Sequence, residues 1–87
     1  MRIKDGFVLR TVAGSNVVVP VGDRALDFNG VITLNGTGMF LWRLLESETD
    51  EAALSAALVE EYKIDEALAQ DCVAEFVGKL KENDFLA

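Results

Sequence analysis

Carboxylates are the most abundant groups in this chain that could do chemistry. Three pairs of acids are sequence neighbours: Asp50/Glu51, Glu60/Glu61 and Asp65/Glu66. A pair of carboxylates acts in acid–base catalysis or metal binding only when both groups share one face, and neighbours on a helix point in different directions. These acids lie at predicted helix ends, where solvation and the helix dipole account for them. The spacing of an EF-hand loop is also missing, so we predict no catalytic residue and no metal.

Other common catalytic groups are scarce. The chain has no histidine and one cysteine, Cys72, which excludes an imidazole base, an internal disulfide and a thiolate zinc site made by this chain alone. We expect Cys72 to be buried in a helix as a small hydrophobic residue. Gly36 and Gly38 lack the further residues of a dinucleotide or P-loop motif. A turn and a helix cap account for them, with an anion site as the alternative, and we predict no cofactor.

Size and composition indicate one small domain spanning residues 1–87, with a mass of 9.5 kDa. The hydrophobic fraction of 51% is high enough for a folded core. No apolar stretch approaches the ~18 residues of a membrane span, and none resembles the core of a signal peptide. A lone thiol suits a reducing compartment. We therefore expect a cytoplasmic protein that does not bind membranes.

The elements that position these residues change type near the middle of the chain. Up to about Leu34, β-branched residues alternate with turn formers. They predict a hairpin with strands at Phe7–Val12 and Val17–Val19 and a turn at Ala13–Asn16. Pro20 cannot donate to a ladder, so we place the end of the second strand at an edge or a bulge.

Further turn signals follow this hairpin. The segment Gly22–Arg24 predicts a loop before a strand at Ala25–Phe28. Asn29–Gly30 favours a type I′ turn, after which Val31–Leu34 returns as the last strand. We expect three or four short antiparallel strands in total.

From Asn35 onward the apolar residues repeat with the period of a helix. Asn35 can cap a first helix, and Thr49, followed by two acids, predicts the start of a second. Asp65 predicts the start of a third helix that reaches about Asn83, with an apolar plug at Phe85–Leu86. Strands first and helices after define an α+β fold of the winged helix-turn-helix type.

The charge distribution indicates whether a nucleic acid is a suitable partner for this chain. Residues 1–44 hold five basic and three acidic side chains, whereas residues 45–87 hold three basic and twelve acidic ones. The third helix would be the recognition helix, and its acids outnumber Lys79 and Lys81. DNA phosphates need neutralisation by Lys and Arg, so this helix would be repelled. We predict no nucleic-acid partner, and a DNA-binding regulator or a structural oligomeric subunit, such as a homodimer, remains as an alternative.

Two surfaces indicate peptide binding instead. The apolar arc of the third helix runs from Leu68 to Val77 and covers half of the circumference, more than the roughly 100° needed to bury one face. One flank is therefore free to line a groove unless the sheet and Phe85 bury both. Strand Val31–Leu34 is short and uncharged and lacks the Lys or Pro that usually protects an edge. Such an edge permits a peptide to add as a further strand.

The run Phe28–Trp42, with Val18–Gly22, Val73–Phe76 and Leu80, resembles the PqqD family, named for the small partner in pyrroloquinoline quinone biosynthesis. The resemblance covers Gly6–Leu86. It implies the fold of a RiPP recognition element, a winged-helix domain without catalytic activity. It also implies an adaptor that binds the leader segment of a ribosomally made precursor peptide and delivers that precursor to a modifying enzyme, often a radical SAM protein.

The resemblance also implies where the leader binds. It places an antiparallel leader strand on the last strand of the sheet and a helical wall on the third helix. The residues so assigned are Val31, Ile32, Thr33 and Leu34 on the strand, and some of Cys72, Glu75, Phe76 and Lys79 on the helix. Val73 and Val77 would line the other flank, and the sequence leaves open which flank faces the peptide.

Overall fold

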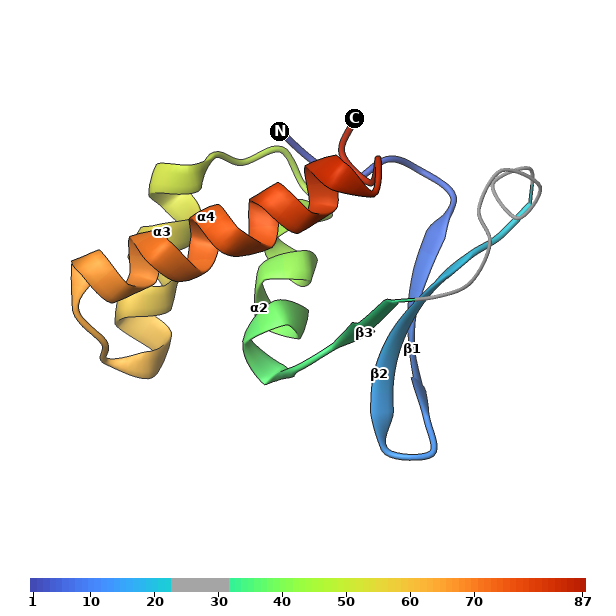
Figure 1. Cartoon of the computed structure of the whole chain (residues 1–87), viewed down its shortest axis with the longest axis horizontal. Coiled ribbons are helices and arrows are strands. Elements are labelled where there is room, and N and C mark those ends of the chain that lie inside the picture. The colour runs from blue at the N-terminus through green and yellow to red at the C-terminus, as the bar shows by residue number, and fades with distance from the viewer. Residues whose placement is uncertain (23–31) are drawn as a thin grey trace. The chain divides into compact units, whose positions relative to one another are not determined.

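The computed structural model describes residues 1–22 and 32–87, in which three strands precede three helices (Figure 1). The elements in chain order are β1 (Phe7–Val12), β2 (Ser15–Pro20), β3 (Ile32–Leu34), α2 (Gly36–Leu45), α3 (Glu51–Tyr62) and α4 (Glu66–Glu82). This order confirms the predicted α+β class with helices after strands. The chain divides into two compact units. We call Lys4–Phe40 the sheet unit, and Met1–Ile3 with Leu41–Ala87 the helical unit.

The sheet unit holds an antiparallel sheet of order β1-β2-β3. Ala13 and Gly14 form the hairpin turn, with φ angles of 51° and 80°. Positive φ at both central residues is the signature of a type I′ turn, which needs only two residues. The hairpin prediction is confirmed, but its turn was predicted too long, because Ser15 and Asn16 already belong to β2. β2 ends at Pro20, one residue beyond the predicted strand end at Val19.

Several predicted features lie outside the described residues. They are part of the loop at Gly22–Arg24, the strand at Ala25–Phe28, the turn at Asn29–Gly30 and the first residue of the last strand, Val31. The last strand is therefore described from Ile32 to Leu34.

Each helix begins at a side-chain cap. The Asn35 Oδ1 atom accepts a hydrogen bond from the Gly38 amide at 2.7 Å, which confirms Asn35 as the cap of α2. Asp50 caps α3 and Asp65 caps α4, each accepting an amide at 2.8 Å. Because Asp50 provides the cap, α3 begins one residue after it, and the predicted start at Thr49 was slightly early. The predicted end of the last helix at Asn83 is confirmed by its position as the C-cap of α4.

The cap of α4 gives a stability prediction. Replacing Asp65 with alanine removes the acceptor for the Leu68 amide and should lower the free energy of unfolding by about 1 kcal/mol. Asp65→Asn should retain most of this stability, because asparagine is also a good cap. Asp71→Ala is the matched control, since Asp71 is exposed in the middle of the same helix. Urea unfolding followed by circular dichroism measures all three variants. Equal losses for Asp65→Ala and Asp71→Ala would contradict the assignment.

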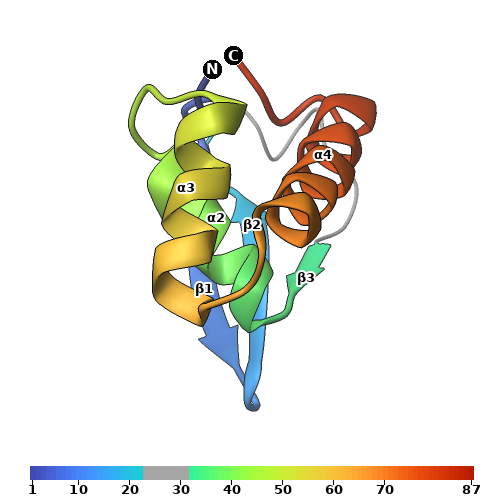
Figure 2. The same cartoon turned by 90° about the vertical axis from the view of Figure 1, so that its left-hand side faces the viewer.

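Helices α3 and α4 pack against each other in the helical unit (Figure 2). The buried hydrophobic residues of this unit are Ile3, Leu41, Trp42, Leu45, Leu54, Leu58, Ala69, Val73, Val77, Leu80 and Phe85. The Trp42 and Phe85 rings meet edge to face, with centroids 5.7 Å apart and planes at 79°. Phe85 is 5% exposed, which confirms the predicted plug at the end of α4. Within the described ranges, no helix has the length and apolarity to cross a bilayer.

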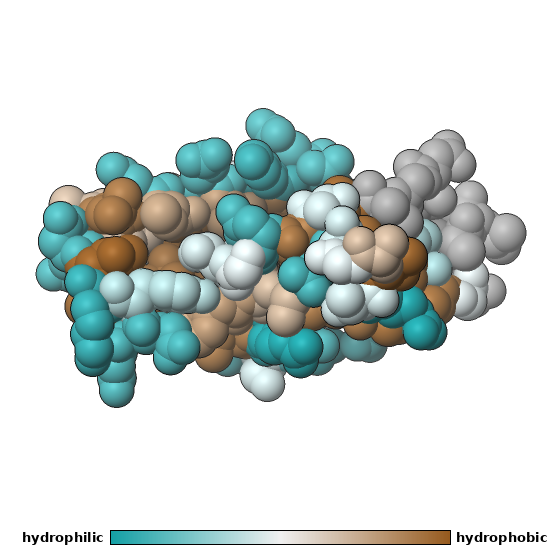
Figure 3. All heavy atoms as spheres, turned by 90° about the horizontal axis from the view of Figure 1, so that it is seen from below, coloured by the Kyte–Doolittle hydropathy of each residue, from teal (hydrophilic) through white to brown (hydrophobic). Residues whose placement is uncertain are grey.

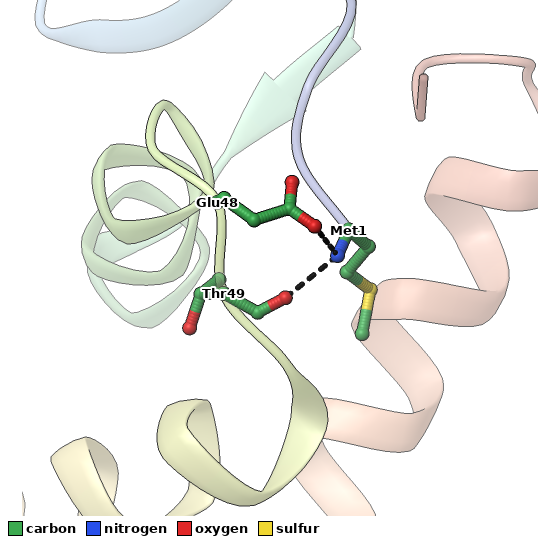
Figure 4. A network of polar contacts seen from close by, with 3 residues as sticks. All are labelled: Met1, Glu48 and Thr49. Atoms are coloured by element: carbon green, nitrogen blue, oxygen red, sulfur yellow. Dashed lines mark hydrogen bonds and ion pairs between the residues drawn. The ribbon is translucent and has the colours of Figure 1, made fainter.

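The segment Met1–Ile3 is tied into the helical unit by its backbone. The Met1 ammonium donates to Glu48 Oε1 at 2.9 Å and to the Thr49 carbonyl at 2.7 Å (Figure 4). The Ile3 amide donates to the Leu45 carbonyl at 2.8 Å, and Ile3 also forms a β-bridge with Leu86. This short segment therefore joins the loop before α3 to the chain after α4.

Candidate functional site

Strand β3 forms one edge of the sheet. In the described part of the chain its strand partner is β2, and no further strand pairs with its other side. Ile32, Thr33 and Leu34 carry no charge, and β3 contains none of the Lys or Pro residues that commonly block edge pairing. The edge of β3 is therefore suited to receive another strand.

The order in which hydrogen-bonded and non-bonded residue pairs alternate along the hairpin, here called its phase, determines which backbone N–H and C=O groups of β2 face β3. The Val21 amide donates to the Gly6 carbonyl at 2.8 Å, so Gly6 and Val21 form a hydrogen-bonded pair. This pair directly follows the pair Phe7 and Pro20 in the register. Hydrogen-bonded and non-bonded pairs alternate along an antiparallel ladder. The same phase follows from the type I′ turn, whose flanking pair is hydrogen-bonded. Val17 therefore bonds to β1, and its two neighbours in β2 direct their backbone groups toward β3.

This phase turns the backbone of Thr33 toward the side of β3 on which the described residues place no further strand. Thr33 lies opposite Val17, while Ile32 and Leu34 lie opposite the residues of β2 that face β3. Ile32 and Leu34 thus bond to β2, whereas the N–H and C=O of Thr33 point away from it. The Thr33 side chain is exposed, and the Leu34 side chain is 7% exposed on the opposite face. One residue therefore offers both a donor and an acceptor to an added strand.

The helical unit resolves which flank of α4 forms the core. Ala69, Val73, Val77 and Leu80 are buried. Leu68 is 48% exposed, and Cys72 and Phe76 are half-buried. The flank with Val73 and Val77 therefore packs inside the helical unit, and the other flank remains accessible. We call the residues Leu68, Cys72, Glu75, Phe76 and Lys79 the α4 flank.

The α4 flank combines an apolar stripe with a polar border. Glu75 and Lys79 are one helical turn apart and form an ion pair of 3.7 Å, with side-chain exposures of 74% and 69%. At 100° per residue they fall beside Leu68 and Cys72 on the same side of the helix. On the face of the molecule drawn in Figure 3, brown and tan hydrophobic surface lies beside teal hydrophilic side chains. The apolar stripe and the polar border of the α4 flank fit an apolar ligand residue next to a polar one.

The structure thus gathers the predicted residues into two groups. Ile32, Thr33 and Leu34 share the edge strand of the sheet unit, while Val31 lies outside the described residues. The four predicted helical residues share the α4 flank. Cys72 is half-buried, so the prediction of a buried thiol was wrong. The fully buried side of α4 passes through its neighbour Val73 instead. Leu68 was missed as a site residue, although it begins the apolar arc that the sequence shows.

Among the described residues, no group of three His, Cys, Asp or Glu side chains is arranged to hold a metal ion. The polar groups of the site include the β3 backbone, the exposed Thr33 hydroxyl and the Glu75–Lys79 pair. A strand edge binds a peptide chain by backbone hydrogen bonds, and an accessible apolar helix flank binds side chains by burial. The sheet unit supports the first kind of contact and the helical unit the second.

Two solved structures share this fold. One is TbiB1 in complex with the TbiA(beta) leader peptide, with a TM-score of 0.77, 21% sequence identity, and coverage of 99% of this chain and 94% of that chain. The other is lasso peptide synthetase B1 complexed with the leader peptide, with a TM-score of 0.73, 21% identity, and coverage of 97% and 93%. At this identity the likeness establishes the fold.

Comparison with curated proteins gives no match. A family model does match: coenzyme PQQ synthesis protein D (PqqD) aligns with residues 16–86, which include β2 from its second residue onward, β3 and all three described helices. The match spans both the edge strand and the α4 flank. The chain therefore belongs to the PqqD family.

Proposed function

We propose that this protein is a non-catalytic adaptor that binds the leader segment of a ribosomally made precursor peptide and presents the precursor to a modifying enzyme. The leader adds as an antiparallel strand to the edge of β3. Membership of the PqqD family supports this function, and both similar solved structures are complexes with leader peptides. The family resemblance implies a modifying enzyme such as a radical SAM protein.

The observation that carries the proposal is the outward-facing backbone of Thr33, which pairs with no strand of residues 1–22 or 32–87. Its N–H and C=O point away from β2 at an uncharged edge. One residue of an antiparallel leader strand can exchange both hydrogen bonds with Thr33, and side chains on either side of that residue then alternate between the two faces. Main-chain bonds of this kind give affinity without demanding one leader sequence.

The α4 flank supplies the side-chain contacts in this proposal. Cys72 and Phe76 bury apolar leader residues, while Glu75 and Lys79 meet polar ones. Leu68, with 48% of its surface exposed, extends the apolar stripe toward the start of the helix. Burying an exposed apolar side chain contributes about 25 cal/mol per Å² removed from water. The strand and the helix would therefore both contribute to leader affinity, and the side-chain contacts on the helix would supply the specificity.

An adaptor of this kind acts by raising the effective concentration of the precursor at the enzyme. Linking a weakly bound substrate to its enzyme through a second contact makes the catalytic encounter intramolecular. The gain requires no catalytic group on the adaptor itself. Duplex DNA is a poorer partner, because α4 exposes Glu66, Asp71, Glu75 and Glu82.

A titration tests the proposal. The ¹⁵N-labelled protein is titrated with the leader of the precursor encoded beside its gene, with a scrambled leader and a short DNA duplex as controls. We expect micromolar leader to shift the amides of Ile32, Thr33 and Leu34 and those of the α4 flank. Neither control should do so at low salt.

Unshifted β3 and α4 amides at saturating leader would contradict the adaptor function. Shifts with duplex DNA would instead indicate a DNA-binding regulator. The remaining alternative is a structural oligomeric subunit, which sedimentation of the free protein tests. A mass that rises with concentration, together with no response to leader, would indicate such a subunit.

A further inference from the structure

Helix α3 carries apolar residues on the side that faces away from the core of the helical unit. Leu54 and Leu58 are fully buried, whereas Ala52 and Ala56, on the opposite side, are exposed. Surface helices of globular proteins normally place charged and polar residues on that outer side, and a helix that is apolar all round is normally covered. The outer side of α3 therefore has the character of an interface.

This outer side forms part of a groove within the helical unit. Ala52, Ala56 and Val59 of α3 line it together with Glu60 and Glu66, and its volume is about 400 Å³. Alanine side chains leave room for the backbone of another segment to approach closely. Val59 also lines the groove and is half-buried, so it adds apolar surface to the lining.

The charges around the groove indicate what kind of segment it fits. The helical unit holds twelve acidic and five basic side chains, which accounts for the whole formal net charge of −7. Within the described part of the chain, no basic side chain pairs with Glu60. The Glu66 Oε1 atom accepts a hydrogen bond from Gln70 Nε2 at 3.3 Å, a neutral partner. Both carboxylates at the rim are thus available to a cation from outside.

We propose that this groove docks a basic segment of the modifying enzyme, in which a small apolar side chain sits against Ala52 and Ala56 and a Lys or Arg meets Glu60 and Glu66. The inference rests on the adaptor function proposed above and names the surface that the enzyme contacts. Opposite charges across an interface steer association and fix its register. The negative field of the helical unit favours a positively charged enzyme surface.

The side of α4 that borders the groove suits an adaptor that holds two partners at once. Glu66 and Leu68 both lie in the first turn of α4, yet at 100° per residue they point about 160° apart around the helix. The groove and the α4 flank therefore occupy different sides of this helix. The leader and the enzyme can each contact α4 without sharing residues.

Charge reversal at the rim tests the docking surface. The purified modifying enzyme encoded beside this gene is titrated with the leader-bound protein, and its Kd is measured for the wild type, for Glu60→Lys and for Glu60→Lys combined with Ala56→Lys. We expect the single variant to weaken enzyme binding about tenfold and the double variant about 100-fold. Raising the salt concentration should weaken wild-type binding and leave the double variant almost unchanged.

Glu82→Lys is the matched control, because it makes the same charge change at the other end of α4, sixteen residues and about 24 Å from Glu66. It should change the enzyme Kd less than threefold. Thermal unfolding checks that each variant remains folded. Leader binding to each variant should stay within twofold of the wild type, so that loss of enzyme binding is separated from loss of the leader site.

Three results would overturn the inference while leaving the adaptor function intact. Enzyme binding could be unaffected by the double variant, or Glu82→Lys could weaken it as much as Glu60→Lys does. The wild type could also form a dimer that the double variant abolishes, with no change in the enzyme Kd, which would assign the groove to a second copy. If the wild type binds no leader at all, the adaptor function itself fails.

Discussion

Replacing Thr33 with proline is expected to weaken leader binding by about 30- to 150-fold. Proline removes the outward N–H of β3 and leaves a leader carbonyl buried without a donor. A lost hydrogen bond together with an unsatisfied buried acceptor costs about 2–3 kcal/mol, and each 1.4 kcal/mol corresponds to a tenfold change in Kd. Because Ile32 and Leu34 carry the bonds to β2, the sheet itself should keep its pairing.

The hairpin offers a matched control for this substitution. Thr11 lies in a non-bonded pair with Asn16, so its N–H points outward from the opposite edge of the sheet, just as that of Thr33 does from β3. Thr11→Pro therefore makes the same change at the edge that the leader does not use. It should leave the leader Kd within about threefold of wild type. Fluorescence anisotropy of a labelled leader measures both variants.

Thr33→Val separates the backbone from the side chain. Valine preserves the N–H and the β-branched shape of threonine but removes its hydroxyl group. If strand addition explains binding, Thr33→Val should bind leader almost as well as wild type. An equal loss for Thr33→Val and Thr33→Pro, or for Thr11→Pro and Thr33→Pro, would contradict strand addition at β3.

Replacing Trp42 with alanine is expected to lower the free energy of unfolding by about 3–5 kcal/mol. Trp42 is 1% exposed and meets Phe85 edge to face at 5.7 Å. Its removal loses the burial of a large aromatic side chain and leaves a cavity beside the plug. Small domains are stable by only about 5–15 kcal/mol, so this variant should be close to unfolding at room temperature.

Urea unfolding by circular dichroism measures this loss. Tyr62→Ala is the control, because Tyr62 is also aromatic but is 43% exposed, and it should cost less than about 1 kcal/mol. Phe85→Ala keeps Trp42, the one tryptophan of the chain, as a fluorescent reporter of the same contact. A loss for Trp42→Ala no larger than that for Tyr62→Ala would show that the plug does not stabilise the helical unit.

Local signals predicted the helices well. Asn35, Asp50 and Asp65 cap helices with their own side chains, and a cap depends on residues within one turn. The change from β-branched residues to helical periodicity near Leu34 likewise depends on neighbours along the chain. The boundary of β2 was less accurate, because Ala13 adopts a positive φ that alanine seldom takes, which shortens the turn.

The site residues depended on information beyond the local sequence. The apolar arc of α4 showed two usable flanks, and only packing in the helical unit assigns Val73 and Val77 to the core and Leu68 to the surface. The outward direction of the Thr33 backbone follows from the phase of the whole ladder, set by the turn at Ala13 and Gly14. A one-residue shift would have reversed it. No pattern within β3 alone carries that information.

Amide hydrogen exchange at Thr33 tests strand addition most directly. In the free protein the amides of Ile32 and Leu34, bonded to β2, should exchange slowly, and that of Thr33, at the open edge, should exchange fast. Saturating leader should slow exchange at Thr33 by at least about tenfold, because its N–H then donates to the leader backbone. Fast exchange at Thr33 in the saturated complex would contradict the proposed leader site on β3.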